Sequence, residues 1–168
     1  MRKYIACYLV GLIGLLVTFE GIAQETPISE DEVPMSVQGY FYSHYSNAKE
    51  VKWSNINNIG EELIRITFSM KDADKNVVMT MNGDIQEEVS VSKKANIDYI
   101  MSEKSLKKHP DGKVLALRKV TKFNLQGFTA PQSYYEVSLK NGKEIVYVYF
   151  DNDKQLLTND NVFDLAVN

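Results

Sequence analysis

The amino-acid sequence predicts an α+β fold made of two tandem repeats, each a helix followed by an antiparallel meander. Both helices are expected on one face of a joined, concave sheet. Apolar side chains recur at helical spacing in Val37, Phe41 and Tyr45, and runs of alternating apolar and polar residues follow them. The same order then returns in the second half, where residues 77–81 align with residues 146–150. This self-similarity is the reason to expect a repeat.

The first 23 residues have the layout of a secretory signal peptide. Arg2 and Lys3 precede an apolar run, and Gly21 and Ala23 place small residues before a cleavage site. The run is too short to span a membrane comfortably, so cleavage is favoured over an uncleaved anchor. We therefore expect a periplasmic or secreted protein without stable membrane insertion. The single cysteine, Cys7, would leave with this segment, so the mature chain would have no disulfide.

The composition is that of an ordinary globular protein, with 168 residues, 44% of them hydrophobic and 24% charged. The net charge of −3 argues against nucleic acid as a partner, because such binding needs clustered lysine and arginine. We expect a monomer.

The mature chain divides into four segments. Residues 24–32 are polar and are predicted to be a flexible lead-in. Residues 33–91 form the first repeat, with a helix from Pro34 to about Asn47 and strands near 51–54, 63–70, 77–81 and 85–91. The register of that last strand is left open. Residues 92–158 form the second repeat, with a helix over 93–108 capped by Ser92, an extended segment over 114–123 and a hairpin over 133–150. Residues 159–168 are a C-terminal tail.

The hairpin carries the candidate binding residues. Asn141-Gly142 predicts a type I′ turn, which would place Tyr134 opposite Tyr149 and Glu136 opposite Tyr147. One face of the hairpin then carries three tyrosines and an isoleucine, more apolar surface than a solvated sheet face needs. Arg65, from the matching strand of the first half, would extend this surface with a charge. The predicted binding residues are Tyr134, Glu136, Ile145, Tyr147, Tyr149 and Arg65. Sheet packing, or cover by the C-terminal tail, is the other explanation for these tyrosines.

Enzymatic chemistry finds little support in the sequence. The mature chain has no cysteine nucleophile, no Gly-x-Ser-x-Gly elbow and no phosphate-binding glycine loop. His44 and His109 fall at the ends of the two predicted helices, where a partial positive charge is favourable. The segment 72–76 resembles the start of a calcium loop but lacks the glycine and the glutamate that such a loop requires. We expect no catalytic residue, no metal and no cofactor.

The sequence resembles the PepSY-like family, whose members are small exported bacterial domains described as similar to β-lactamase inhibitory protein. The resemblance covers residues 32–158 and is carried by Val33-Pro34, Val37, Phe41, Tyr45, Ala48, Val51 and Trp53, with Tyr135-Glu136-Val137 and Phe150-Asp151 in the second half. Ser46 departs from the proline usual after the helix tyrosine, and the turn after Asp151 lacks the usual glycine. The resemblance implies two repeats, a concave sheet and an exported location. It implies no activity, because a fold does not specify a function.

The functional hypothesis is a non-enzymatic, exported binding domain that presents an open, tyrosine-bearing sheet face to an envelope or secreted protein. An inhibitor of an envelope hydrolase is one specific form of it. The alternatives are a structural or stress-related envelope protein without a dedicated ligand site, and a protein that binds a small ligand.

Overall fold

The structure is a computed structural model that describes residues 24–58, 60–92, 98–124 and 129–158. The predicted signal peptide over residues 1–23 and the predicted tail over residues 159–168 lie outside the described residues.

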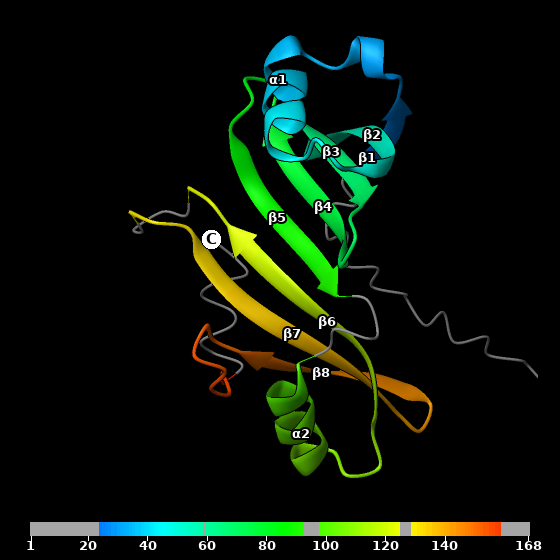
Figure 1. The fold of residues 1–168 in the computed structure, drawn as a ribbon, viewed down its shortest axis with the longest axis vertical. Helices are drawn as coiled ribbons and strands as arrows, with labels where there is room; N and C mark the ends of the chain where they lie inside the picture. The colour runs from blue at the N-terminus through cyan, green and yellow to red at the C-terminus, as the bar shows by residue number, and fades with distance from the viewer. Residues whose placement is uncertain (1–23, 59, 93–97, 125–128, 159–168) are drawn as a thin grey trace, which may run out of the picture.

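A single antiparallel sheet of eight strands makes up most of the described chain, and its strands follow one another in chain order without a crossover (Figure 1). The strands are β1 (Gln24–Ile28), β2 (Lys49–Asn58), β3 (Glu61–Ser69), β4 (Ala73–Thr80), β5 (Ile85–Ser92), β6 (Lys113–Lys122), β7 (Gln132–Asn141) and β8 (Glu144–Phe150). Three short helical segments interrupt this order: η1 (Glu30–Glu32), α1 (Met35–His44) and α2 (Tyr99–Lys108).

The predicted fold class is wrong: the protein is not two tandem helix-plus-meander repeats. The described chain is instead mostly strand: one eight-stranded antiparallel sheet with only two short α-helices. Residues 87–91 of β5 pair with residues 118–122 of β6, so no break divides the sheet into two repeats. The segment 24–32 is not a flexible lead-in either, since it contains β1 and η1. β1 precedes both α-helices in the chain and pairs with β2 along its whole length. These strand pairings join segments far apart in sequence, so local periodicity could not reveal them.

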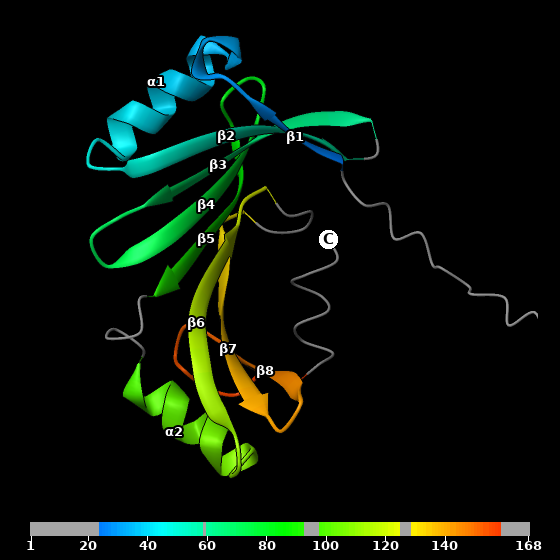
Figure 2. The ribbon, with the colours of Figure 1, turned by 90° about the vertical axis from the view of Figure 1, so that its right-hand side faces the viewer.

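Both helices cover the same face of the sheet, on the left in Figure 2. Val37 and Phe41 of α1 are completely buried against a cluster that includes Trp53, Ile64 and Ile66. Met101 of α2 is buried in a second cluster with residues of β6, β7 and β8, namely Leu117, Val137, Leu139, Val148 and Phe150. Strand side chains alternate between faces, so the residues between these core positions project from the opposite face. We call that opposite face the open face.

The two helices begin and end differently from the predictions. α1 ends at His44, and His109 is the C-cap of α2, so both histidines occupy helix C-termini as expected. α2 begins at Tyr99, where the Asp98 carboxylate caps it by accepting a hydrogen bond from the main-chain N–H of Met101 at 3.1 Å. Residues 93–97 of the predicted helix lie outside the described residues. Ser92, the predicted cap, is the last residue of β5.

The β7–β8 hairpin has a different turn from the predicted one. The two loop residues are Gly142 and Lys143, and only the glycine has a positive φ, of 62°. A glycine at the first central position is typical of a type II′ turn. Asn141 therefore pairs with Glu144, which shifts the register by two residues from the predicted one. An even shift leaves each side chain on its predicted face, but it changes every cross-strand partner.

The register of β5, left open by the sequence, includes a bulge. Met79 lies opposite Ile85, whereas Val78 lies opposite Glu87, so β5 carries one extra residue at this point.

Candidate functional site

The open face carries all six of the predicted binding residues. The strand registers place Arg65 on β3, Tyr134 and Glu136 on β7, and Ile145, Tyr147 and Tyr149 on β8 with their side chains on this one face. They do not form one cluster. Arg65 is separated from the other five by three strands, and the five differ widely in exposure.

Tyr134 packs in an apolar stripe that crosses three strands. Val89, Val120 and Tyr134 lie opposite one another on β5, β6 and β7, and Tyr134 is only 8% exposed. The ring of Tyr149 meets that of Tyr134 edge to face, with centroids 6.2 Å apart. Leu157 also packs against this cluster. The sequence paired Tyr134 directly with Tyr149, but the two are diagonal neighbours because Glu136 lies opposite Tyr149.

Burial changes the acidity of both tyrosines. It raises the pKa of Tyr134 to about 12, and the carboxylates of Glu87 and Glu136 act in the same direction by opposing a phenolate. Burial also raises the pKa of Tyr149, again with a contribution from Glu136. Both phenols stay protonated at neutral pH, so they can donate a hydrogen bond but offer no nucleophile or base.

Glu136 is part of a cross-strand ion pair rather than a free carboxylate. Arg118 Nη1 donates to Glu136 Oε1 at 2.9 Å from the neighbouring strand β6. The glutamate is buried whereas the arginine side chain is 41% exposed, so the pair presents its cation to solvent. Arg118 is not among the residues predicted from the sequence, because its place beside Glu136 depends on the register of β6 against β7.

Ile145 and Tyr147 are the exposed members of the set. Ile145 is 55% exposed and Tyr147 is 49% exposed, although both are large and apolar. They alternate along β8, which is the last strand of the sheet. Tyr147 lies opposite Ser138 and Ile145 lies opposite Lys140, so no aromatic partner covers either from β7.

Arg65 belongs to the other end of the open face. Its guanidinium pairs with Glu25 of β1, a residue that the sequence analysis assigned to the flexible lead-in. Its Nε is buried without a hydrogen-bond partner among the described residues. Arg65 therefore joins β3 to β1 and is not adjacent to the tyrosines.

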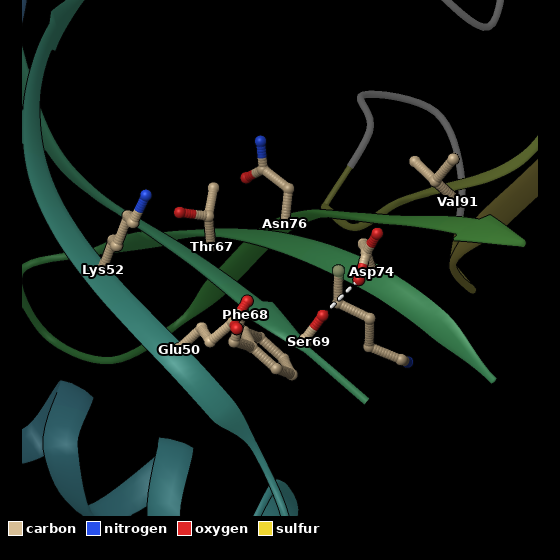
Figure 3. A pocket seen from close by; sticks show the side chains of 9 residues that line it. Glu50, Lys52, Thr67, Phe68, Ser69, Asp74, Asn76 and Val91 are labelled. Atoms are coloured by element: carbon tan, nitrogen blue, oxygen red, sulfur yellow. Dashed lines mark hydrogen bonds between the residues drawn. The ribbon is translucent and has the colours of Figure 1, made fainter. Parts of the chain in front are cut away.

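A shallow hollow of the open face lies over β2 to β5. It encloses about 300 Å³, and its lining includes Lys52, Thr67, Asn76 and Val91. Lys52, Thr67 and Asn76 lie opposite one another on β2, β3 and β4, and Figure 3 shows their side chains pointing to the same side. Asn76 Oδ1 is buried without a hydrogen-bond partner among the described residues.

The hollow has a local structural cause. Glu50, at its rim, has a positive φ of 54°, where β2 shifts register between Lys49 and Lys52. Ser69 and Asp74 are hydrogen-bonded to each other at the same rim (Figure 3). Residues 72–76 resemble the start of a calcium loop in the sequence. In the structure, Asp74 and Asn76 are strand residues of β4 that face the hollow.

No metal-binding cluster occurs among the described residues, since no group of three or more histidine, cysteine, aspartate or glutamate side chains converges there. In the same part of the chain, no helix is long and apolar enough to cross a membrane. What the open face can do chemically is bind: it combines an apolar stripe, two exposed apolar side chains, an outward cation and a polar hollow.

No family model matches the sequence, and no curated protein matches it. The PepSY-like resemblance is thus not confirmed. Similar solved structures do exist. A DUF2874 family protein from Bacteroides ovatus superposes with a TM-score of 0.57 at 16% identity, over 74% of this chain and 84% of that one.

Two further structures have comparable likeness. A protein from Bacteroides eggerthii, described as a putative periplasmic protein, superposes with a TM-score of 0.57 at 16% identity, over 75% of this chain and 86% of that one. A BLIP-like protein from Bacteroides fragilis reaches 0.55 at 15% identity, over 73% and 82% of the two chains. Identities this low show a common fold and do not transfer a function.

Proposed function

We propose that this chain is a non-enzymatic, exported binding protein of the bacterial cell envelope that takes a protein partner on its open face. The observation that carries the proposal is the exposure of Ile145 and Tyr147 on a sheet face that neither helix covers. Large exposed apolar side chains beside a polar rim are typical of protein interaction sites. The periplasmic or secreted location follows from the N-terminal signal-peptide layout, and the B. eggerthii neighbour is described as periplasmic.

The buried tyrosines have a supporting role in this proposal. Tyr134 and Tyr149 stiffen the strands that present Ile145 and Tyr147, and the Arg118–Glu136 pair adds a fixed, outward cation. A rigid platform lowers the entropy that is lost on binding. An inhibitor of an envelope hydrolase is the most specific form of the proposal, and the likeness to a BLIP-like protein supports it.

The experiment is a crosslinking capture from the periplasm with three baits made from the full chain. They are the native protein, a double variant Ile145→Ala with Tyr147→Ala, and a control with Tyr99→Ala and Ile100→Ala. The control removes the same two residue types from the helix-covered side, where Tyr99 is 76% and Ile100 is 47% exposed. We expect a partner that native and control baits capture and the first variant loses. Equal capture by all three baits would refute the open face as the site.

A structural role without a dedicated partner is the second candidate, because the packing of Tyr134 and Tyr149 by itself accounts for two of the three tyrosines. It predicts that no protein crosslinks to the native bait in a manner sensitive to Ile145 or Tyr147. The inhibitor form predicts in addition that the captured partner is a protease or β-lactamase, and that the purified chain stops its activity at a one-to-one ratio.

A further inference from the structure

The last strand of the sheet has an outer edge that no other strand of the described residues covers over most of its length. Two main-chain hydrogen bonds mark that edge: Leu157 N–H donates to Tyr149 O at 2.9 Å, and Asp151 N–H donates to Gln155 O at 3.0 Å. Alternate residues of a strand direct their N–H and C=O groups to the same side. The main-chain groups of Ile145 and Tyr147 therefore point outward as well. Among the described residues no strand pairs with them there.

This edge lacks the proline and charged residues that usually prevent another strand from pairing with an edge strand. Between Ile145 and Phe150 the sequence Ile-Val-Tyr-Val-Tyr-Phe contains no charged residue and no proline. The opposite edge, β1, carries Pro27 and Glu25 within five residues. Proline and charge are the common protections of an edge strand. The return segment over residues 151–157 covers only the C-terminal end of β8.

A basic groove lies beside the same edge on the helix-covered side. It has a volume of about 540 Å³ and is lined by Lys104, Lys107 and Lys108 of α2 together with Gln155 and Leu156. Leu156 is 48% exposed and pairs with Phe150 at the end of β8, which places the groove next to the edge. The side chain of Lys104 is held by Lys154 O at 2.7 Å. Lys107 pairs with Glu103 at 2.8 Å, which offsets one of the three positive charges, and the lining still has an excess of positive charge on a chain whose net charge is −3.

We propose that the outer edge of β8 accepts an extended, acidic segment of another protein as an additional strand. The main-chain groups of Ile145 and Tyr147 supply the hydrogen bonds, as in other cases of strand addition. Side chains alternate across a strand. The added segment would thus place acidic residues on the helix-covered side, near the lysines, and apolar residues on the open face, beside the side chains of Ile145 and Tyr147.

Charge complementarity decides the occupant. A second copy of this chain, paired edge to edge, would bring a second set of the same three lysines to the helix-covered side. An acidic strand brings the opposite charge. The proposal goes beyond the function proposed above, because the main-chain edge of β8 and the lysines of α2 define the site, and the side chains of the open face only flank it.

The test measures fluorescence anisotropy of labelled ten-residue peptides on protein purified from cells that express the full chain. The probe alternates glutamate and valine. One control peptide contains five glutamates followed by five valines, and a second alternates lysine and valine. Two pairs of protein variants accompany them. Tyr147→Pro removes the outward N–H, whereas Tyr147→Ala keeps it and removes the same side chain. Lys107→Glu with Lys108→Glu reverses the groove charge, whereas Lys49→Glu with Lys71→Glu makes the same change far from β8.

We expect the alternating acidic peptide to bind the native protein at least about tenfold more tightly than either control peptide, and more weakly as salt rises. Tyr147→Pro and the groove variant should each lose about tenfold or more, and the distant lysine variant should retain binding. Tyr147→Ala removes an apolar contact but keeps the main-chain N–H, so it should lose clearly less than Tyr147→Pro. Circular dichroism of every variant checks that the sheet is intact. Equal binding of the alternating and block peptides would overturn the proposal, and so would retained binding in Tyr147→Pro. Self-association that Tyr147→Pro abolishes, without peptide binding, would overturn it in favour of a second copy as the occupant. Partner capture by the double variant Ile145→Ala with Tyr147→Ala tests the function proposed for the open face. Its outcome can differ from that of the peptide experiment, so the failure of one proposal is distinguishable from the failure of the other.

Discussion

Replacing Tyr134 and Tyr147 separately by alanine should have very different effects on stability, although the two residues lie on the same sheet face. Tyr134 is 8% exposed and packs against Val89, Val120 and Tyr149, whereas Tyr147 is 49% exposed. Removing a buried aromatic side chain costs about 3–5 kcal/mol, so we expect a loss of about 3 kcal/mol in the free energy of unfolding for Tyr134→Ala. Tyr147→Ala should lose less than about 1 kcal/mol.

Urea unfolding measures both values. With a slope of about 2 kcal/mol per molar urea, the loss for Tyr134→Ala corresponds to a midpoint lower by about 1.5 M. Trp53, the single tryptophan, is buried in the cluster under α1, so its fluorescence reports unfolding at the end of the sheet away from Tyr134. Circular dichroism reports the loss of secondary structure in the whole chain. Coincident transitions would show that the continuous sheet unfolds as one unit. The reasoning fails if Tyr134→Ala loses less than about 1 kcal/mol, or if Tyr147→Ala loses as much as Tyr134→Ala does.

Three further predictions follow from single residues. Burial raises the pKa of Tyr134 to about 12, so the folded state favours the neutral phenol. The unfolded state ionises near pH 10, so up to about 3 kcal/mol in the free energy of unfolding should be lost as pH rises from 10 to 12. Tyr134→Phe should lose less stability over the same range in urea titrations. The hydrogen bond that Asp98 accepts from Lys154, together with the main-chain N–H groups of the α2 N-terminus, lowers the pKa of the Asp98 carboxyl. Asp98→Ala should therefore cost about 1–2 kcal/mol at pH 7 and progressively less as acidification protonates the native carboxylate; a cost that does not fall with pH would contradict the cap and the pair. Gly142→Ala should cost about 1 kcal/mol in thermal unfolding, because its φ of 62° strains any residue with a Cβ, and an unchanged midpoint would argue against the type II′ turn.

The candidate surface shows how far sequence reasoning reaches on this chain. Alternation along the hairpin assigned Tyr134, Glu136, Ile145, Tyr147 and Tyr149 to one face, and a register error of two residues did not alter that assignment because the strand period is two. The exposure of each side chain could not be predicted in the same way. Which tyrosine is buried depends on Val89 and Val120, which belong to strands that the hairpin sequence does not contain.

The residues missed by the sequence analysis were all placed by pairing between distant segments. Arg118 reaches Glu136 only through the β6–β7 register, and Glu25 reaches Arg65 only because β1 joins the sheet. The hollow lined by Lys52, Thr67 and Asn76 draws on three strands with no shared local pattern. A pattern confined to one segment cannot specify its neighbour across a sheet.

The sequence by itself determined the existence and location of most strands, the C-terminal positions of both helices and the division of each strand into two faces. These features depend on local periodicity and on short-range signals such as glycine at a turn. Only the tertiary structure decided that the strands follow one another through the sheet in chain order, that residues 24–28 are its first strand, and that no described strand pairs with Ile145 and Tyr147 at the outer edge of β8. The physical reason is that hydrogen bonds between strands are satisfied by residues far apart in the chain, so the burial of Tyr134 and the exposure of Ile145 are properties of the whole sheet.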